Sequence, residues 1–250
     1  MKKTTQLVIA LCIAAWAVQA QSVMVIQKKG GEVTRIPVDQ IDRITYETAG
    51  APTPSANTVR DADGNVYKTV RIGHQVWMAE NLRTTKYNDG TPIQHLPDYK
   101  AWENASSGAY SWYMNNIDSK PTYGGLYNWH AVNTGKLCPV GWHVPIDEEW
   151  TALLRELGSI PGAKLKEVGQ ANWKDNTDNV TNETGFTALP GGYRINNGNF
   201  SSAGTQGNFW TTSRNGDKEA FYRGIYNYTS LVLKYSFPLS NGLSVRCVRD

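Results

Sequence analysis

The last quarter of the chain is a series of short apolar segments separated by glycine and asparagine turns. From residue 185 onward it reads as five such segments: GFTALPGGYR, GNFWTTS, AFYRGIYN, LVLKYSF and LSVRCVRD. Short segments of this kind, bounded by turn residues, are typical of antiparallel strands. The sequence therefore predicts an antiparallel sheet built late in the chain.

One clear amphipathic helix precedes this sheet. Within PIDEEWTALLRELG the apolar residues recur at i, i+3, i+4 and i+7, which places them on one face of a helix. Pro145 precedes the pattern, acidic residues crowd its first turn, and Gly158 follows its last turn. A second short helix is expected in GAKLKEVG. One or two early helices, a late antiparallel sheet and long loops predict an α+β domain.

The first 20 residues have the parts of a secretory signal peptide. Lys2 and Lys3 form a positive start, residues 7–18 are an uncharged apolar run, and Val18-Gln19-Ala20 predicts cleavage before Gln21. The run is shorter than the roughly 20 residues that span a membrane. We expect residues 1–20 to be removed, leaving no transmembrane segment, and the protein to be secreted or displayed on the cell surface. A retained anchor is the alternative.

Removal of this leader leaves two of the three cysteines, Cys138 and Cys247. An even pair in an exported protein is a candidate disulfide, and two buried free thiols are the alternative. Cys12 is interpreted as part of the leader. A lipoprotein is a lesser alternative, because Leu11 rather than a small residue precedes Cys12.

The charge of the chain argues against a nucleic-acid partner. The net charge is +3, and two of the positive charges lie in the leader, so the mature chain is near +1. A strongly basic nucleic-acid binder is therefore excluded. Charged residues make up only 19% of the chain and aromatic residues 11%, so much of the polar surface must be uncharged. Such a surface suits neutral partners.

Three parts are expected in the mature chain. Residues 21–47 form a small β-strand unit, in which Gly30-Gly31 is the turn of a hairpin. A lone hairpin is marginally stable in water, so this unit must dock or serve in assembly; it loosely resembles the lead segments of exported proteins of the Bacteroidetes type. Residues 48–58 have the composition of a linker, and residues 59–250 form the main domain.

Five strings in this domain carry a resemblance to a known family. They are VWMAENLR (76–83), YGGLYNW (123–129), CPVGWHVPIDEEWTALL (138–154), GFTALPGGYR (185–194) and GLSVRCVRD (242–250). In this order they resemble the Fibrobacter succinogenes major paralogous domain family. That family is distantly similar to formylglycine-generating enzymes. HVPIDEEWTALL resembles the helix motif of those enzymes, and LSVRCVRD resembles their closing strand. The resemblance implies a C-type-lectin-like domain, with helices flanking a twisted antiparallel sheet and long loops, and no settled activity.

No catalytic constellation stands out. The four histidines lack metal-ligand spacing, and nucleophile-elbow and phosphate-loop motifs are absent from the sequence. His130 and His143 lie among tryptophans and are predicted to be core residues. A formylglycine-generating enzyme needs reactive cysteines, whereas Cys138 and Cys247 fall at positions that look structural. We therefore expect a protein that is not an enzyme, with an enzyme of that type as the least favoured alternative.

A polar loop, WKDNTDNVTNETGF (173–186), is the first candidate for ligand binding. Its oxygen-bearing side chains suit Ca²⁺, and its amides and aromatic ring suit a sugar. The candidate residues are Trp173, Asp175, Asp178, Asn179 and Glu183. Ca²⁺ is the one possible cofactor, although the Glu-Pro-Asn and Trp-Asn-Asp strings of calcium-dependent lectins do not occur. A solvated loop without a ligand is the alternative.

A second candidate is the aromatic stretch 98–123. If exposed, Trp112 and Tyr113, with Trp102, Tyr110 and Tyr123, would form a sugar-stacking or protein-binding face. If buried, they form a second core cluster, which is the favoured interpretation. The function expected from all these features is an exported, non-catalytic module that binds glycan or protein partners through its loops. The alternative is an assembly subunit of a surface complex or fibre, with residues 22–47 donating a strand.

Overall fold

The structure is a computed structural model that describes residues 22–27, 33–40, 57–176 and 179–250. The chain divides into two compact units, Met1–Pro52 and Thr53–Asp250. The predicted leader, the Gly30-Gly31 turn and residues 48–56 of the predicted linker lie outside the described residues.

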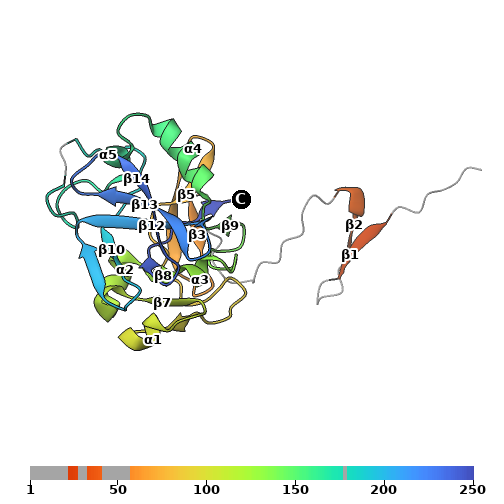
Figure 1. The fold of residues 1–250 in the computed structure, drawn as a ribbon. Coiled ribbons are helices and arrows are strands. Elements are labelled where there is room, and N and C mark those ends of the chain that lie inside the picture. The colour runs from red at the N-terminus through yellow and green to blue at the C-terminus, as the bar shows by residue number, and fades with distance from the viewer. Residues whose placement is uncertain (1–21, 28–32, 41–56, 177–178) are drawn as a thin grey trace, which may run out of the picture. The chain divides into compact units, whose positions relative to one another are not determined.

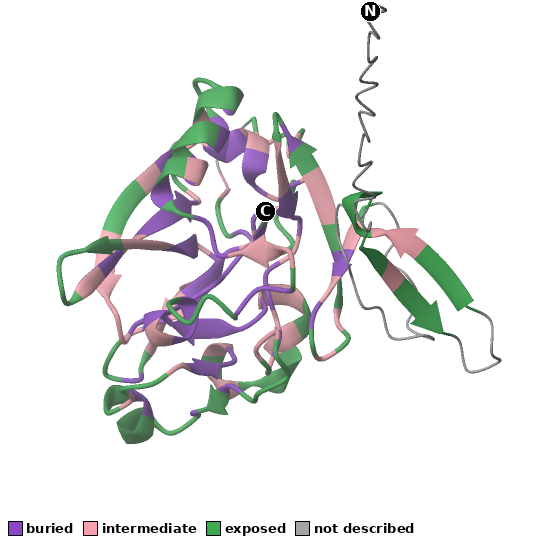
Figure 2. Cartoon of the chain, turned by 90° about the vertical axis from the view of Figure 1, so that its right-hand side faces the viewer, coloured by how far each residue is buried: buried purple, intermediate pink, exposed green. Residues whose placement is uncertain are grey.

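In the first unit, β1 (Val23–Gln27) and β2 (Val33–Pro37) pair antiparallel, with Val25 opposite Arg35. A 3₁₀ turn, η1 (Val38–Gln40), follows β2. Apolar side chains of both strands are exposed, among them Val25 and Val33, and Figure 2 shows the ribbon mainly in the colour of exposed residues. A two-stranded ribbon has too little surface to bury these side chains by itself.

The second unit contains two sheets (Figure 1). The five-stranded sheet has the order β3-β4-β5-β16-β9. The nine-stranded sheet has the order β14-β13-β12-β10-β15-β8-β7-β6, and β11 pairs with β10. The bounds of the first set are β3 (Thr58–Arg60), β4 (Val66–Ile72), β5 (Gln75–Met78), β9 (Trp142–His143) and β16 (Val248–Arg249). Those of the second set are β6 (Gln94–His95), β7 (Ala109–Ser111), β8 (Leu126–Asn128), β10 (Gly191–Arg194), β11 (Phe200–Ala203), β12 (Gln206–Asn215), β13 (Glu219–Tyr226), β14 (Val232–Pro238) and β15 (Gly242–Leu243).

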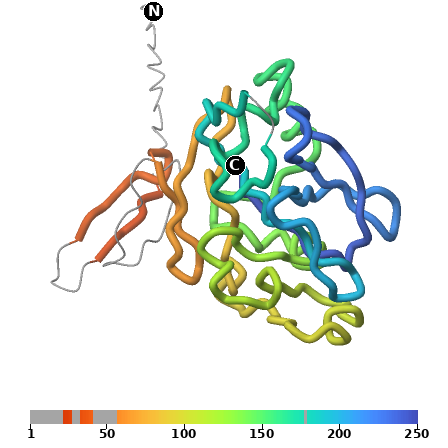
Figure 3. The backbone as a smooth tube through the Cα atoms, turned by 90° about the vertical axis from the view of Figure 1, so that its left-hand side faces the viewer, coloured from red at the N-terminus to blue at the C-terminus, as the bar shows by residue number. Residues whose placement is uncertain are grey.

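The helices of this unit are short. They are α1 (Tyr99–Glu103), α2 (Lys120–Tyr123), α3 (Trp129–Val132), α4 (Asp147–Leu157) and α5 (Pro161–Leu165), with 3₁₀ turns η2 (Tyr113–Asn115) and η3 (Ile117–Ser119). Both predicted helices are present, as α4 and α5. The sequence missed α1 to α3 because four or five residues are too few for a helical period to be visible. Sheets with a few short helices are compatible with the predicted α+β class, and Figures 1 and 3 show α1 and α4 at opposite ends of the unit.

Helix α4 is fixed at both its apolar face and its start. Trp150, Leu153 and Leu157 are buried in a core cluster that also contains Trp77 and Phe186. At the first turn, the Asp147 carboxylate pairs with Arg223 of β13 at 2.7 Å and with Lys234 of β14 at 2.8 Å. These contacts join the helix to the edge of the large sheet.

The expected disulfide is present between Cys138 and Cys247, which are 109 residues apart in the sequence. Cys247 directly precedes β16, and the backbone of Met78 in β5 donates to its carbonyl at 3.0 Å. Both cysteines lie in a second core cluster, with Tyr127, Trp129 and Trp210. The bond therefore joins the end of the chain to the loop that leads into β9 and α4.

Candidate functional site

A pocket of about 560 Å³ lies between the β4–β5 ribbon and the turn at residues 185–187. The ladder of this ribbon extends past its strands, because the backbone of Ala79 donates to the carbonyl of Lys68 at 2.9 Å. This pairing brings Lys68 and Glu80 to the same end of the ribbon. The lining consists of Asn57, Lys68, Thr69, Val70, Ala79, Glu80, Gly185 and Thr187. Charged, hydroxyl and amide groups around a small apolar floor are typical of a site for a polar ligand.

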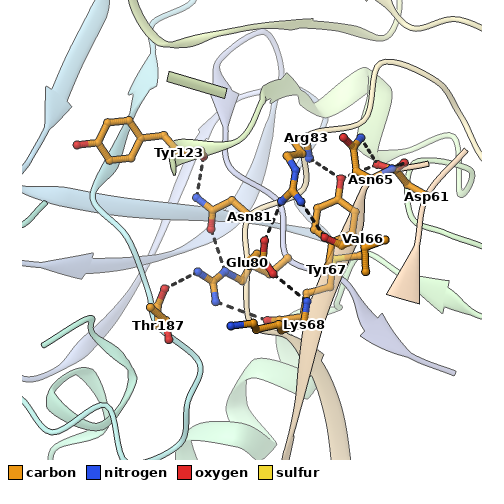
Figure 4. Close-up of polar contacts among 12 residues, drawn as sticks. Asp61, Asn65, Val66, Tyr67, Lys68, Glu80, Asn81, Arg83, Tyr123 and Thr187 are labelled. Atoms are coloured by element: carbon orange, nitrogen blue, oxygen red, sulfur yellow. Dashed lines mark hydrogen bonds and ion pairs between the residues drawn. The ribbon is translucent and has the colours of Figure 1, made fainter. Parts of the chain in front are cut away.

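The Glu80 carboxylate is held in place by both of its oxygen atoms (Figure 4). Oε1 accepts a hydrogen bond from the backbone of Lys68 at 2.8 Å, and Oε2 pairs with the Arg83 guanidinium at 2.9 Å. Arg83 also donates to the carbonyl of Val66 at 2.7 Å. Glu80 is therefore oriented by β4, and Arg83 offsets its negative charge.

Behind these residues a buried tyrosine fixes the strand. The Tyr67 hydroxyl donates to Asp61 at 2.5 Å and accepts from the backbone N–H of Arg83 at 3.0 Å, as Figure 4 shows. Burial, with the nearby Asp61 carboxylate, raises the pKa of Tyr67 far above its ordinary value. The phenol thus stays protonated and keeps donating to Asp61.

The opposite wall is held by Arg246, whose side chain is fully buried. Its Nε donates to Asn81 at 2.9 Å, and its Nη2 donates to the carbonyl of Thr187 at 2.7 Å. Nη1 donates to the carbonyl of Phe186, and the guanidinium lies 4.3 Å from the centre of that ring. Burial lowers the pKa of Arg246 to about 9. These bonds hold the turn in which Thr187 has a φ of 54°, a left-handed conformation that L side chains rarely adopt.

Three strings that are distant in the sequence meet at this pocket. Ala79 and Glu80 come from VWMAENLR, Gly185 and Thr187 from GFTALPGGYR, and Arg246 from GLSVRCVRD. A strand pattern in each string gives no reason to group them, because the strings lie far apart in the sequence. The signal that points to the site is that the same strings carry the family resemblance.

Residues 70–249 match the sequence model of the Fibrobacter succinogenes major domain family. The chain belongs to this family. No curated protein and no solved structure matches the chain. The match covers β5, α4 and the late strands, and with them Glu80 and Thr187 of the pocket. The lining residues Asn57, Lys68 and Thr69 precede the matched region.

In the predicted ligand loop 173–186, the structure contradicts the role of one residue, Trp173. Trp173 is completely buried, and its Nε1 donates to the carbonyl of Ala188 at 2.9 Å, which contradicts a role in stacking on a sugar. Asp175 and Asn179 are exposed, and Asp178 lies outside the described residues. The exposed Glu183 pairs with Lys164 at 3.0 Å. Within the described ranges, no group of three or more acidic, histidine or cysteine side chains is placed to hold a metal ion.

The aromatic stretch 98–123 is mostly core. Trp112 is 4% exposed, so the expectation that it stacks on a ligand is wrong, and Trp102 and Tyr110 are also buried. Tyr113 is half-buried, and its ring contacts Phe200 and Tyr123 at centroid distances of 5.5 and 6.5 Å. Of the five aromatic residues named in this stretch, Tyr113 and Tyr123 are thus the two that are partly exposed.

His143 is not the core histidine that its tryptophan neighbours suggested, because its side chain is 37% exposed. Its Nδ1 lies 2.6 Å from the Asp250 carboxylate, and its Nε2 lies 2.8 Å from that of Glu149. Burial lowers the pKa of His143, but the two carboxylates outweigh that effect and raise it overall. The group joins the last residue of the chain to the first turn of α4.

Proposed function

We propose that this chain is an exported, non-catalytic module that binds a glycan or protein partner, and that the pocket between β4, β5 and residues 185–187 is its contact site. The observation that carries this proposal is the fixed lining of the pocket. Glu80 and the 186–187 turn are each held by hydrogen bonds from within the domain. A preformed site binds without first ordering its own side chains, which favours affinity.

The proposal includes a C-type-lectin-like fold for the main domain and export of the chain. A C-type-lectin-like domain, distantly related to formylglycine-generating enzymes, is supported by short helices beside two sheets and by a C-terminal strand, β16, between β5 and β9. The Cys138–Cys247 disulfide supports export, because such bonds persist in oxidising compartments. In the described part of the chain, no helix has the length and apolar character needed to cross a membrane.

Binding by the mature chain on a glycan array and in polysaccharide pull-downs, with and without Ca²⁺, tests the proposal. Lys68→Trp puts a bulky ring at the mouth of the pocket while keeping the backbone bonds of β4, so it should abolish binding. Lys218→Trp, in the exposed turn between β12 and β13, is the matched control and should bind as the unmodified chain does. Absence of binding under all conditions, or equal binding by both variants, would contradict the proposal.

A second candidate function is assembly. It is favoured by the exposed apolar side chains of β1 and β2, which include Val23, Val25, Ile26 and Val33. A strand pair of this kind can add to the sheet edge of another copy. Deleting residues 22–47 should then convert oligomers to monomers, measured by light scattering, while the remaining domain stays folded. Unchanged assembly would argue against this function.

An enzyme of the formylglycine-generating type is the least favoured candidate. It needs a reactive thiol, whereas Cys138 and Cys247 are bonded to each other. Thiol titration of the mature chain should therefore find no free cysteine. A reactive thiol in the native protein would restore this candidate.

A further inference from the structure

The pocket is surrounded by more positive than negative charge. Lys68 and Glu80 belong to its lining, and Arg83 and Arg246 lie directly behind it. Glu80 is the only acidic side chain among these four, and its charge is already offset by Arg83. These four side chains therefore carry three positive charges and one negative charge.

Arg246 donates to no carboxylate in the described residues, although the nearby Glu80 charge partly counteracts the effect of burial and raises its pKa. Among the described residues, its hydrogen-bond acceptors are all neutral: the Asn81 amide oxygen and the carbonyls of Met78, Phe186 and Thr187. A charge in the protein interior is screened far less than one in water. The guanidinium therefore adds positive potential at the Thr187 wall of the pocket, part of which Glu80 offsets.

Lys68 adds to this potential from the opposite wall. Its backbone N–H and carbonyl are used in the β4–β5 ladder and by Glu80, but its ammonium forms no ion pair with any residue in the described ranges. The side chain is exposed at the mouth of the pocket. It is thus free to donate to a ligand.

We infer that this pocket takes a carboxylate-bearing sugar, a uronic acid unit of an acidic glycan. This inference rests on the proposed binding function and specifies its ligand. The carboxylate would bind the Lys68 ammonium in the field of Arg246.

The hydroxyl of Thr69 and the amide of Asn57 offer partners for the sugar hydroxyls. The Thr187 hydroxyl already accepts from Asn182 and donates to Gly185, so it can add only one further accepted hydrogen bond. The volume of about 560 Å³ lies within the ordinary range for small-ligand sites.

Calorimetric titration of the mature chain with a tetragalacturonate, and with the same oligosaccharide methyl-esterified, tests this inference. The acidic form should bind and the ester should bind about tenfold more weakly or not at all, because a charge-assisted hydrogen bond is lost. Binding of the acidic form should also weaken as salt is raised, since Lys68 is exposed to solvent.

Three variants test whether the charge of Lys68 binds the carboxylate of the sugar. Lys68→Gln should weaken binding of the acidic oligosaccharide about tenfold, and Lys218→Gln should leave it unchanged. Glu80→Gln keeps an oxygen for the backbone of Lys68 but removes the opposing charge, so it should strengthen binding. Far-ultraviolet circular dichroism and thermal melting confirm that each variant is folded.

Two results would overturn the inference while leaving the proposed binding function standing. One is equal affinity for the acid and its ester. The other is a neutral array ligand whose binding depends on the pocket while tetragalacturonate does not bind. Tighter, Lys68-dependent binding of a tripeptide through its terminal carboxylate would overturn the sugar assignment. If neither oligosaccharide nor any array glycan binds, both proposals fail together.

Discussion

At the scale of single residues, three buried cationic side chains bind backbone carbonyls of segments that are distant in the sequence. Arg246 binds the carbonyls of residues 186 and 187, Arg194 binds those of Leu96 and Pro97, and Lys166 binds those of residues 226 and 229. Burial lowers the pKa of each, to about 9, 10 and 8 respectively. Each side chain donates to these backbone carbonyls, in loops or, for Tyr226, at the end of β13, and so supplies the partners that buried backbone groups need.

Replacing Arg246 should therefore destabilise the domain strongly. Arg246→Met leaves the carbonyls of Phe186 and Thr187 and the Asn81 amide oxygen without their donor. We expect the free energy of unfolding to fall by about 3 kcal/mol, the order of cost for several buried unsatisfied groups. Urea unfolding measures the change. Arg249→Met, three residues later and exposed, is the control and should change stability by less than about 0.5 kcal/mol.

His143 should make part of the stability depend on pH. Its pKa is higher in the folded chain than the ordinary value of 6.5, because Asp250 and Glu149 favour the protonated ring. The stabilisation from protonated His143 is fully present below the pKa of His143 in the unfolded chain. It is lost as the pH rises through the pKa of His143 in the folded chain. The stability difference between the unmodified chain and His143→Gln should thus be larger at pH 5.5 than at pH 8.5.

Urea unfolding at both pH values measures this stability difference, and an NMR titration of the His143 ring measures its pKa. Asp250→Asn removes one of the two carboxylates, so it should lower the pKa of His143 and shrink the pH-dependent difference. The account of His143 is wrong if the two pH values give the same difference.

At the scale of elements, α5 shows why the helix propensity of a residue does not by itself predict how its substitution changes stability. Alanine normally favours a helix over glycine by about 1 kcal/mol. A Cβ at Gly162, however, would lie 2.9 Å from the backbone carbonyls of Ser230 and Leu231, in the turn before β14. The close approach also allows the N–H of Gly162 to donate to the carbonyl of Ser230 at 2.8 Å.

Gly162→Ala should consequently destabilise the domain by about 1–3 kcal/mol, since overpacking against backbone outweighs the helix preference. Ala152→Gly in α4, at an exposed position, measures the preference alone and should cost about 1 kcal/mol. Denaturant unfolding of both variants gives the comparison. A Gly162→Ala variant more stable than the unmodified chain would show that the backbone at Ser230 and Leu231 moves to accommodate the added Cβ.

The disulfide joins two segments that are distant in the sequence and that lead into the paired strands β9 and β16. In the chain-entropy account, closing a loop of this size stabilises a protein by about 4–5 kcal/mol, and the two cysteines are 109 residues apart. The double variant Cys138→Ala, Cys247→Ala should lose an amount of that order in urea unfolding. Reduction of the unmodified chain should give a similar loss. A change below about 1 kcal/mol would mean that the core alone fixes β16.

At the scale of the whole molecule, the main domain should fold without the first unit. The three core clusters of the described residues and the disulfide lie entirely within residues 59–250. A chain of residues 53–250 should therefore unfold in one cooperative transition, at the same temperature as the mature chain under identical conditions. Calorimetry measures both. A loss of cooperativity would show that residues 21–52 complete the core.

The sequence predicted well those elements whose signal is local and repeated. Helix α4 carries a full amphipathic pattern, and the late strands alternate with turn residues, so both were expected. The pocket was not expected, because Glu80, Thr187 and Arg246 each belong to a separate strand-like segment. The predicted ligand tryptophans Trp112 and Trp173 were misplaced, because a polar stretch of sequence does not reveal that its aromatic ring points inward.

By itself, the sequence determined the family, the main helices, the late strands and the cysteine pair, because these depend on residue type, spacing and number. The tertiary structure alone decided which charges meet. It buried Arg246 against the carbonyl of Thr187, brought Lys68 and Glu80 to one pocket, and set His143 between two acids. The physical reason is that burial and distance set the strength of a charge, and neither can be read along the chain.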